Sequence, residues 1–203
     1  MTPEGVVHDM TRVLILGANG GLARNTTRLF LERAGVELTL YLRRAGRLPN
    51  PAPDRVRIVE GDVLDASALR DAMTGQDVVY ANLSGNMAAQ ARAIVDAMHD
   101  TGLRRLIFIS SMGIYGEVPG ERYRSVLDPY RDSAALIEAS DLDWTILRPG
   151  WFVRGAPASC RLTRKGEPFV GHDVSIDALS KLIVDLATRN GLHVHESLGV
   201  SSE

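Results

Sequence analysis

The amino-acid sequence predicts an α/β protein, with residues 1–203 forming one domain on a doubly wound parallel sheet. Three observations lead to this expectation. Short apolar runs alternate with amphipathic stretches along the chain. The runs show no polar alternation, which is typical of strands covered on both faces. A glycine-rich turn joins the first run to the first amphipathic stretch, and strands that alternate with helices form parallel sheets.

The expected helices and strands are located by the spacing of their apolar residues and by the residues at which they end. In the first helix Leu22, Leu29 and Phe30 recur at helical spacing before Gly35, and Gly102 ends the longest helix. The strands are expected at 12–17, 37–43, 55–61, 77–83, 104–111, 143–150 and 191–200. The helices are expected between the glycine turn and Gly35, and at 65–73, 87–102, 132–140 and 175–191. The last strand would carry His193 and His195 on one face.

Two less regular segments, 112–128 and 150–172, follow the carboxyl ends of two expected strands. In an open α/β sheet, ligands bind at that edge. We therefore expect these segments to cover a substrate. The second contains a basic stretch with Arg161, Arg164 and Lys165, which is either a solvated surface or an attraction for an acidic substrate.

Composition limits the partners and the compartment. The formal net charge of −2 gives no electrostatic reason to expect nucleic acid or an anionic membrane. A single cysteine, Cys160, fits a reducing compartment, and the first ten residues lack the pattern of a secretory signal. We expect a cytoplasmic protein that acts on a small molecule, with no metal, since His193 and His195 lack further ligands at recognised spacing.

The glycine turn between the first strand and helix has the pattern G-x-x-G-x-x-A, formed by Gly17, Gly20 and Ala23. The first glycine permits a sharp turn, the second lets the backbone approach a pyrophosphate, and the third small residue lets helix pack on strand. Helix amides then face the phosphates. The pattern predicts a Rossmann-type dinucleotide site, whose turn also includes Asn19, Gly21 and Leu22.

Two arginines at the end of the second strand bear on the choice of dinucleotide. An acidic side chain there would bind the ribose hydroxyls of NAD, but this chain has Arg43 and Arg44. Guanidinium groups suit a 2′-phosphate, so the expected cofactor is NADP(H). The alternative is that both arginines are solvated charges on a loop that also carries Arg47.

With these motifs, the chain from Arg12 to about Gly199 resembles the atypical short-chain dehydrogenase/reductases, in particular the NmrA-like and biliverdin/flavin reductase-like NAD(P)H-binding proteins. The resemblance implies further cofactor contacts at the ends of four expected strands. Asp62 and Val63 would line the adenine, and the backbone of Ala81, Asn82 and Leu83 would line the cofactor. Ser110, and Pro149 in the motif LRPG, would lie close to the nicotinamide.

The same resemblance implies catalytic residues. ISSMGIYG resembles the family's S-S-x-x-x-Y-G stretch and places Ser111 at the catalytic serine. DPYRDSA resembles P-Y-x-x-S-K, which places Tyr130 at the catalytic tyrosine and Ala134 where a lysine is expected. In the full motif, the lysine lowers the tyrosine pKa by its charge and holds the nicotinamide ribose. Alanine does neither.

The expected function is an NADPH-dependent reductase of a small conjugated or carbonyl substrate, of the flavin, quinone, enone or aldehyde type. Such acceptors delocalise charge and need no strong protein acid. Two alternatives stay open because of Ala134: a non-catalytic NADP(H)-sensing regulator, and a redox-neutral NAD(P)-dependent isomerase or epimerase. Monomer and homodimer are both compatible with the sequence.

Overall fold

The computed structural model describes residues 10–155 and 159–203, and its centre is an eight-stranded sheet. Neighbouring strands follow the order β3-β2-β1-β4-β5-β6-β10-β8. All pairs are parallel except β10 with β8, which is antiparallel. In chain order the strands are β1 (Thr11–Leu16), β2 (Val36–Leu42), β3 (Val56–Glu60), β4 (Val78–Ala81), β5 (Arg105–Ile109), β6 (Asp143–Pro149), β8 (Cys160–Arg164) and β10 (Glu196–Ser202).

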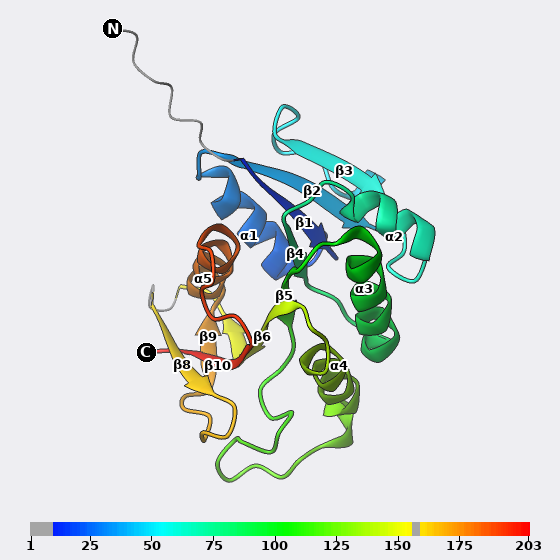
Figure 1. The fold of residues 1–203 in the computed structure, drawn as a ribbon. Coiled ribbons are helices and arrows are strands. Elements are labelled where there is room, and N and C mark those ends of the chain that lie inside the picture. The colour runs from blue at the N-terminus through cyan, green and yellow to red at the C-terminus, as the bar shows by residue number, and fades with distance from the viewer. Residues whose placement is uncertain (1–9, 156–158) are drawn as a thin grey trace, which may run out of the picture.

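Helices cover both faces of this sheet (Figure 1). Helices α1 (Gly21–Leu31) and α5 (Ile176–Thr188) pack together on one face. The opposite face carries α2 (Ala66–Met73), α3 (Met87–Thr101) and α4 (Asp128–Glu138). Short 3₁₀ turns lie at Ala45–Arg47 and Ser125–Leu127. The expected doubly wound α/β fold is thereby confirmed.

The core has two parts because strand side chains alternate between the faces. In β1, Ile15 belongs to the cluster under α1 and α5, while Leu14 and Leu16 belong to the cluster under α2, α3 and α4. All three side chains are completely buried. Burial on both faces explains why β1 is a continuous apolar run in the sequence.

Local capping places the helix ends. Asp65 caps α2 by accepting from the amides of Ser67 and Ala68 at 3.1 Å each. Gly102 ends α3 in the left-handed conformation, φ 72°. Helix α4 begins at Asp128, four residues before the expected start, because Pro129 occupies its first turn, where a missing N–H costs nothing. Tyr130 therefore lies on a helix.

The last strand begins later than the sequence pattern suggests. His193 and His195 do not lie on one face of a strand, and that expectation was wrong. Their φ values are 51° and 59°, so both belong to a left-handed turn before β10. Contacts with β6 hold this turn: the amide of His195 donates to the carbonyl of Trp144 at 2.7 Å.

The segment 150–172 contains regular structure that the sequence pattern did not reveal. Besides β8, it holds β7 (Trp151–Val153), which pairs in parallel with β9 (Asp173–Ser175) as a separate two-stranded sheet. Gly150 permits this close approach, since a Cβ there would lie 2.2 Å from the carbonyl oxygen of His172. The small sheet therefore stands directly at the carboxyl end of β6.

Candidate functional site

The largest crevice at the carboxyl ends of the first strands has a volume of about 500 Å³. It opens where the strand order reverses between β1 and its neighbours β2 and β4, which is the expected ligand position in a doubly wound sheet. We call it the dinucleotide pocket. Its lining residues are Gly17, Asn19, Gly20, Tyr41, Leu42, Arg43, Arg44, Arg47, Gly61, Asp62, Val63, Asn82, Leu83, Ser84 and Gln90.

The glycine turn forms one wall of the dinucleotide pocket. Gly17 has φ +76°, and a Cβ on it would lie 2.1 Å from the carbonyl oxygen of Asn82. A Cβ on Gly20 would lie 2.6 Å from the side-chain nitrogen of Asn82. Gly17 is therefore required sterically, because backbone at the end of β4 is pressed against it, whereas a side chain at position 20 would require only the Asn82 side chain to move.

The start of α1 is suited to bind an anion. Gly20 caps the helix without a side-chain hydrogen bond, and no acidic residue lies in the first turn. The first amides of a helix have no partner within it and carry a partial positive charge. Gly21 is exposed here, whereas Leu22 and Ala23 are buried in the core, as the packing role of the third motif position requires.

Arg24, which the sequence reasoning missed, braces this turn. Its guanidinium donates to the side-chain oxygen of Asn19 at 2.5 Å and to the carbonyl of Arg47 at 3.3 Å. It thus ties the glycine turn to the loop that follows β2. The signal in the sequence is a basic residue one position after the motif alanine.

Three arginines line the far side of the pocket. Arg43 and Arg44 follow β2, and Arg47 lies in the short turn after them. Among the described residues, no carboxylate lies within ion-pair distance of these three guanidinium groups. Their charges are therefore available to an anionic ligand.

The expected adenine wall is held by a tyrosine. The hydroxyl of Tyr41 donates to the carbonyl of Asp62 at 2.9 Å, beneath Gly61. Burial, with Asp65 and then Asp62 nearby, raises the pKa of Tyr41 to about 12. Both Asp62 and Val63 line the pocket. The three residues expected at the end of β4 divide: Ala81, the last residue of the strand, is buried in the core, whereas Asn82 and Leu83 line the pocket.

A second crevice of about 270 Å³, which we call the acceptor pocket, lies at the ends of β5 and β6. It brings together three of the residues singled out in the sequence, Ser111, Tyr130 and Pro149. The remaining lining comes mainly from the segment 112–128 and from the start of β7: Met112, Gly113, Gly116, Val118, Glu121, Arg122, Tyr123, Arg124, Val126, Leu127, Gly150 and Trp151.

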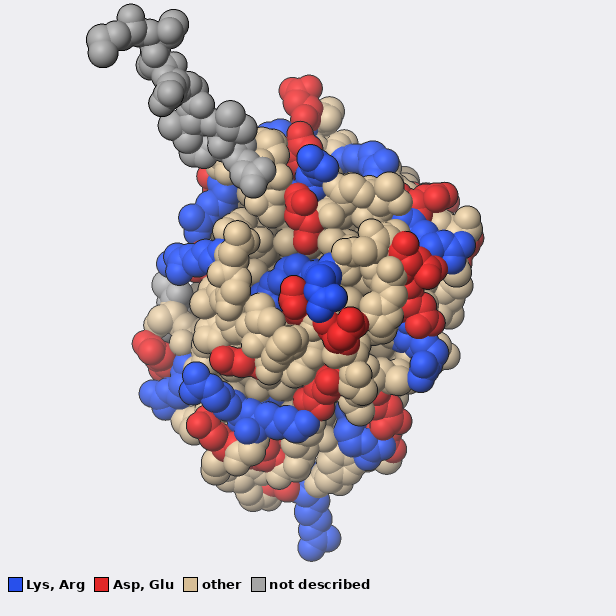
Figure 2. All heavy atoms as spheres, in the orientation of Figure 1, with Lys and Arg blue, Asp and Glu red and all other residues tan. Residues whose placement is uncertain are grey.

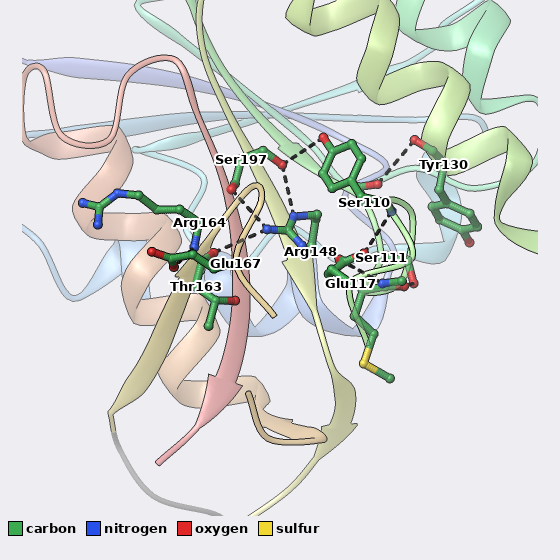
Figure 3. Close-up of polar contacts among 12 residues, drawn as sticks. Ser110, Ser111, Glu117, Tyr130, Arg148, Thr163, Arg164, Glu167 and Ser197 are labelled. Carbon is green, nitrogen blue, oxygen red and sulfur yellow. Dashed lines mark hydrogen bonds and ion pairs between the residues drawn. The ribbon is translucent and has the colours of Figure 1, made fainter. Parts of the chain in front are cut away.

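The two serines of this strand end have different surroundings (Figure 3). Ser111 lies on the pocket wall, and its hydroxyl donates to the carbonyl of Met112 at 3.1 Å. Ser110 is nearly buried, and its hydroxyl points to the backbone carbonyl of Tyr130 at 3.4 Å. Ser111 is thus the better placed of the two to meet a ligand.

Ala134, at the position of the motif lysine, lies in the hydrophobic core. Its side chain is completely buried in the cluster between α4 and the sheet, and it lines neither crevice. The next residue, Ala135, is exposed. Replacement of the motif lysine is therefore part of how α4 packs.

Two of the three basic residues of the second segment have acidic neighbours. The ammonium of Lys165 lies 2.7 Å from the carboxylate of Glu138, and the guanidinium of Arg164 lies 3.7 Å from that of Glu196. Neither residue lines the acceptor pocket. On the face drawn in Figure 2, basic and acidic side chains are interspersed.

Two features are absent from residues 10–155 and 159–203. No three His, Cys, Asp or Glu side chains gather as metal ligands. None of the helices has the length and apolar character needed to cross a membrane.

The fold, the glycine turn and the cationic pocket define a Rossmann-type dinucleotide-binding protein. The chain belongs to the NAD(P)H-binding family, whose model matches residues 17–190. A Rossmann-fold NAD(P)-binding family protein from Shigella flexneri is 38% identical, with a TM-score of 0.85 over 95% of this chain and 94% of that one. A short-chain dehydrogenase/reductase from Veillonella parvula, solved in complex with NADP, is 28% identical with the same TM-score and coverage.

Among curated relatives, an isoflavone reductase homologue from Zea mays is 25% identical over 79% of this chain. The chain spans 55% of that protein, and 12% of an uncharacterized Mycobacterium tuberculosis protein that it matches at 31% identity. The inferred resemblance to atypical short-chain dehydrogenase/reductases is confirmed. The matched proteins thus include a short-chain dehydrogenase/reductase and a reductase homologue.

Proposed function

We propose that the protein is an NADPH-dependent reductase of a small conjugated or carbonyl substrate. The observation that carries the proposal is the presence of two pockets at neighbouring strand ends of one sheet edge, one cationic and one largely apolar. Bound in the first, NADPH would supply a hydride. The neighbour solved with NADP and the maize reductase homologue support this reading.

The dinucleotide pocket supports NADP(H) through its charges. The amides at the start of α1 would hold the pyrophosphate, and Arg43 with Arg44 would bind the 2′-phosphate. Asp62 and Val63 would contact the adenine, and Asn82 and Leu83 the middle of the cofactor. Ser110 and Pro149 are proposed near the nicotinamide.

The acceptor pocket supports a flat, conjugated substrate. Trp151 is 56% exposed and Tyr123 is 41% exposed, although both are large apolar side chains on the pocket wall. The Trp151 ring stacks against that of His172, with centroids 6.5 Å apart. Exposed aromatic faces at a pocket mouth gain contacts when a planar ligand covers them.

Ser111 is the proposed polar contact in this pocket. Its hydroxyl can turn from the carbonyl of Met112 and donate to a substrate oxygen or nitrogen, where negative charge develops as the hydride arrives. The proton that completes the reduction would come from Tyr130 or from water. A conjugated acceptor spreads the charge, so no lysine is needed beside Tyr130.

The test is NADPH oxidation by the purified protein with flavins, quinones, enones and aldehydes. We expect turnover with at least one class, and a fall of about 100-fold in kcat for Ser111→Ala, the size of a lost oxyanion contact. The exposed residue Ser67 on α2 supplies the control Ser67→Ala, which should match the wild type. Tyr130→Phe then separates protein from solvent as the proton source.

Clear NADPH binding without turnover in the whole panel would contradict the reductase and favour the non-catalytic regulator. Tightly retained nucleotide with no net NADPH loss but with substrate rearrangement would favour the isomerase or epimerase. A protein that binds neither nucleotide would overturn the cofactor assignment itself.

A further inference from the structure

A buried ion pair lies behind the acceptor pocket without lining it. Arg148 on β6 is completely buried, and the Glu117 side chain with which it pairs is 6% exposed. Glu117 belongs to the segment 112–128, so the pair joins the sheet to the segment that forms the pocket. Figure 3 shows both side chains pointing toward one another beneath Ser111.

The guanidinium of Arg148 is bound from several sides. Its Nε donates to the hydroxyl of Ser197 at 3.1 Å. Its Nη2 donates to the carbonyls of Ser197 at 3.2 Å and Thr163 at 3.4 Å. The cation thus fixes β6 to β10 and β8, and its remaining donor, Nη1, meets Glu117.

The carboxylate of Glu117 organises the first turn of the segment 112–128. It accepts from the amide of Gly113 at 3.0 Å and from the amide of Tyr115 at 2.9 Å. This closes a turn in which Gly113 and Gly116 have φ of 85° and 71°, and both glycines line the acceptor pocket. The carboxylate therefore holds pocket backbone that immediately follows Ser111.

The same pair reaches the opposite wall of the pocket. Arg148 immediately precedes Pro149, and β7 with Trp151 follows. The two walls meet where the amide of Met112 donates to the carbonyl of Pro149 at 3.2 Å. One buried ion pair is therefore bonded to both walls within a few residues of the proposed contacts.

We propose that Arg148 and Glu117 are positioning residues that set Ser111 relative to the Pro149–Trp151 wall of the acceptor pocket. This proposal rests on the proposed function in that the acceptor binds there. Stability alone does not require the pair, because buried ion pairs can often be replaced by apolar residues of similar size without loss of stability. An apolar pair, however, cannot accept hydrogen bonds from the amides of Gly113 and Tyr115.

This difference defines the experiment. The double variant Arg148→Met, Glu117→Leu removes both charges and refills the space, while Glu117→Gln keeps the shape of the side chain. The exposed pair Arg70 and Asp100, 3.3 Å apart, supplies the matched control Arg70→Met, Asp100→Leu. For each protein we would measure the NADPH Kd, the kcat and KM for the best acceptor of the panel, and peptide hydrogen exchange.

We expect the NADPH Kd to stay within about twofold of the wild type, since neither Arg148 nor Glu117 lines the dinucleotide pocket, where most of the proposed cofactor contacts lie. We expect kcat/KM for the acceptor to fall at least about tenfold, or ~1.4 kcal/mol, in both Glu117 variants. Hydrogen exchange should accelerate in residues 111–117 and stay unchanged around α1. Wild-type acceptor kinetics in a folded double variant would overturn the proposal.

Two other results also bear on the positioning role of the ion pair. If the double variant fails to fold, Glu117→Gln alone carries the test through the same readouts. If the wild type turns over no acceptor, the proposed function fails, and hydrogen exchange judges the positioning role separately. Unchanged exchange of 111–117 in Glu117→Gln would then refute it, whereas acceleration confined to that segment would support it.

Discussion

The dinucleotide pocket and the acceptor pocket share one edge of the sheet, but they are built differently. The first is lined by chain between Gly17 and Gln90, and it presents exposed arginines without carboxylate partners. The second is lined by chain between Ser111 and Trp151, and a buried ion pair lies behind it. Its lining also includes three exposed charged side chains, Glu121, Arg122 and Arg124.

The difference shows how ligand chemistry selects construction. A dinucleotide is an anion of fixed shape, so short motifs and free cations at strand ends suffice to hold it. A small conjugated or carbonyl substrate, as proposed for the second pocket, forms fewer ionic contacts with the protein. The walls of that pocket must therefore be held in place by other contacts. In this chain that task falls on contacts between residues far apart in sequence, such as Arg148 with Ser197.

The largest loss of NADPH affinity is expected from Gly17→Ala, which alters only the dinucleotide pocket. The added Cβ would lie 2.1 Å from the carbonyl oxygen of Asn82, and φ is +76°. We expect NADPH affinity to fall at least ~100-fold, or roughly 2.7 kcal/mol, because the turn and β4 must separate. The control is Gly46→Ala, where no atom lies within 4 Å of an added Cβ. Isothermal titration would show the loss, and normal binding would disprove the steric requirement.

The largest effect on stability, as opposed to affinity, is expected from Ala134→Lys, which restores the motif lysine. Because position 134 is completely buried, we expect a loss of about 3 kcal/mol or more in the free energy of unfolding, and no gain in turnover. The exposed neighbour gives the control Ala135→Lys, which should change stability by under about 0.5 kcal/mol. Urea denaturation and the NADPH assay measure both effects, and a faster, equally stable enzyme would contradict this account of α4.

A smaller effect is expected from Arg43→Gln, which tests whether Arg43 distinguishes NADPH from NADH. Loss of one charged contact to a 2′-phosphate should weaken NADPH binding roughly tenfold, or ~1.4 kcal/mol, and leave NADH binding unchanged. Arg57→Gln removes the same charge from an exposed position outside the dinucleotide pocket. Equal losses of affinity for NADPH and NADH would mean that Arg43 does not bind the 2′-phosphate.

The smallest effect is expected from Tyr41→Phe, which removes the hydrogen bond to the carbonyl of Asp62. NADPH affinity should fall about fivefold, near 1 kcal/mol. The pKa of Tyr41 is raised to about 12, so the phenol keeps its proton and its hydrogen bond throughout the neutral range. The ratio of the two affinities should therefore be constant from pH 6 to 9, and a ratio that changes there would show that Tyr41 titrates earlier.

The sequence predicted the fold well where the signals are local. Apolar runs that alternate with amphipathic stretches located β1 to β6. The glycine turn and Arg43, both singled out in the sequence, line the same pocket. The last strand was misplaced because alternation at His193 and His195 imitates a strand, while contacts with β6 impose a turn. Glycine, proline and capping residues carry local information of this kind.

The support of the acceptor pocket had no comparable signal. Glu117 and Arg148 are separated by 31 residues, and nothing around either one marks a partner. The roles of Ser111 and Tyr130 came from a family resemblance, and their meeting in one pocket depends on where α4 begins. Long-range pairing of this kind emerges only when the sheet is assembled.

The position of β10 between β6 and β8 has a consequence for synthesis of the protein. Every residue that lines the dinucleotide pocket has been synthesised once Gln90 is added. Arg148, by contrast, can complete its hydrogen bonds to Ser197 only after that residue is made. The nascent chain can thus complete its nucleotide-binding surface early, while the acceptor half is finished only when translation reaches the final strand.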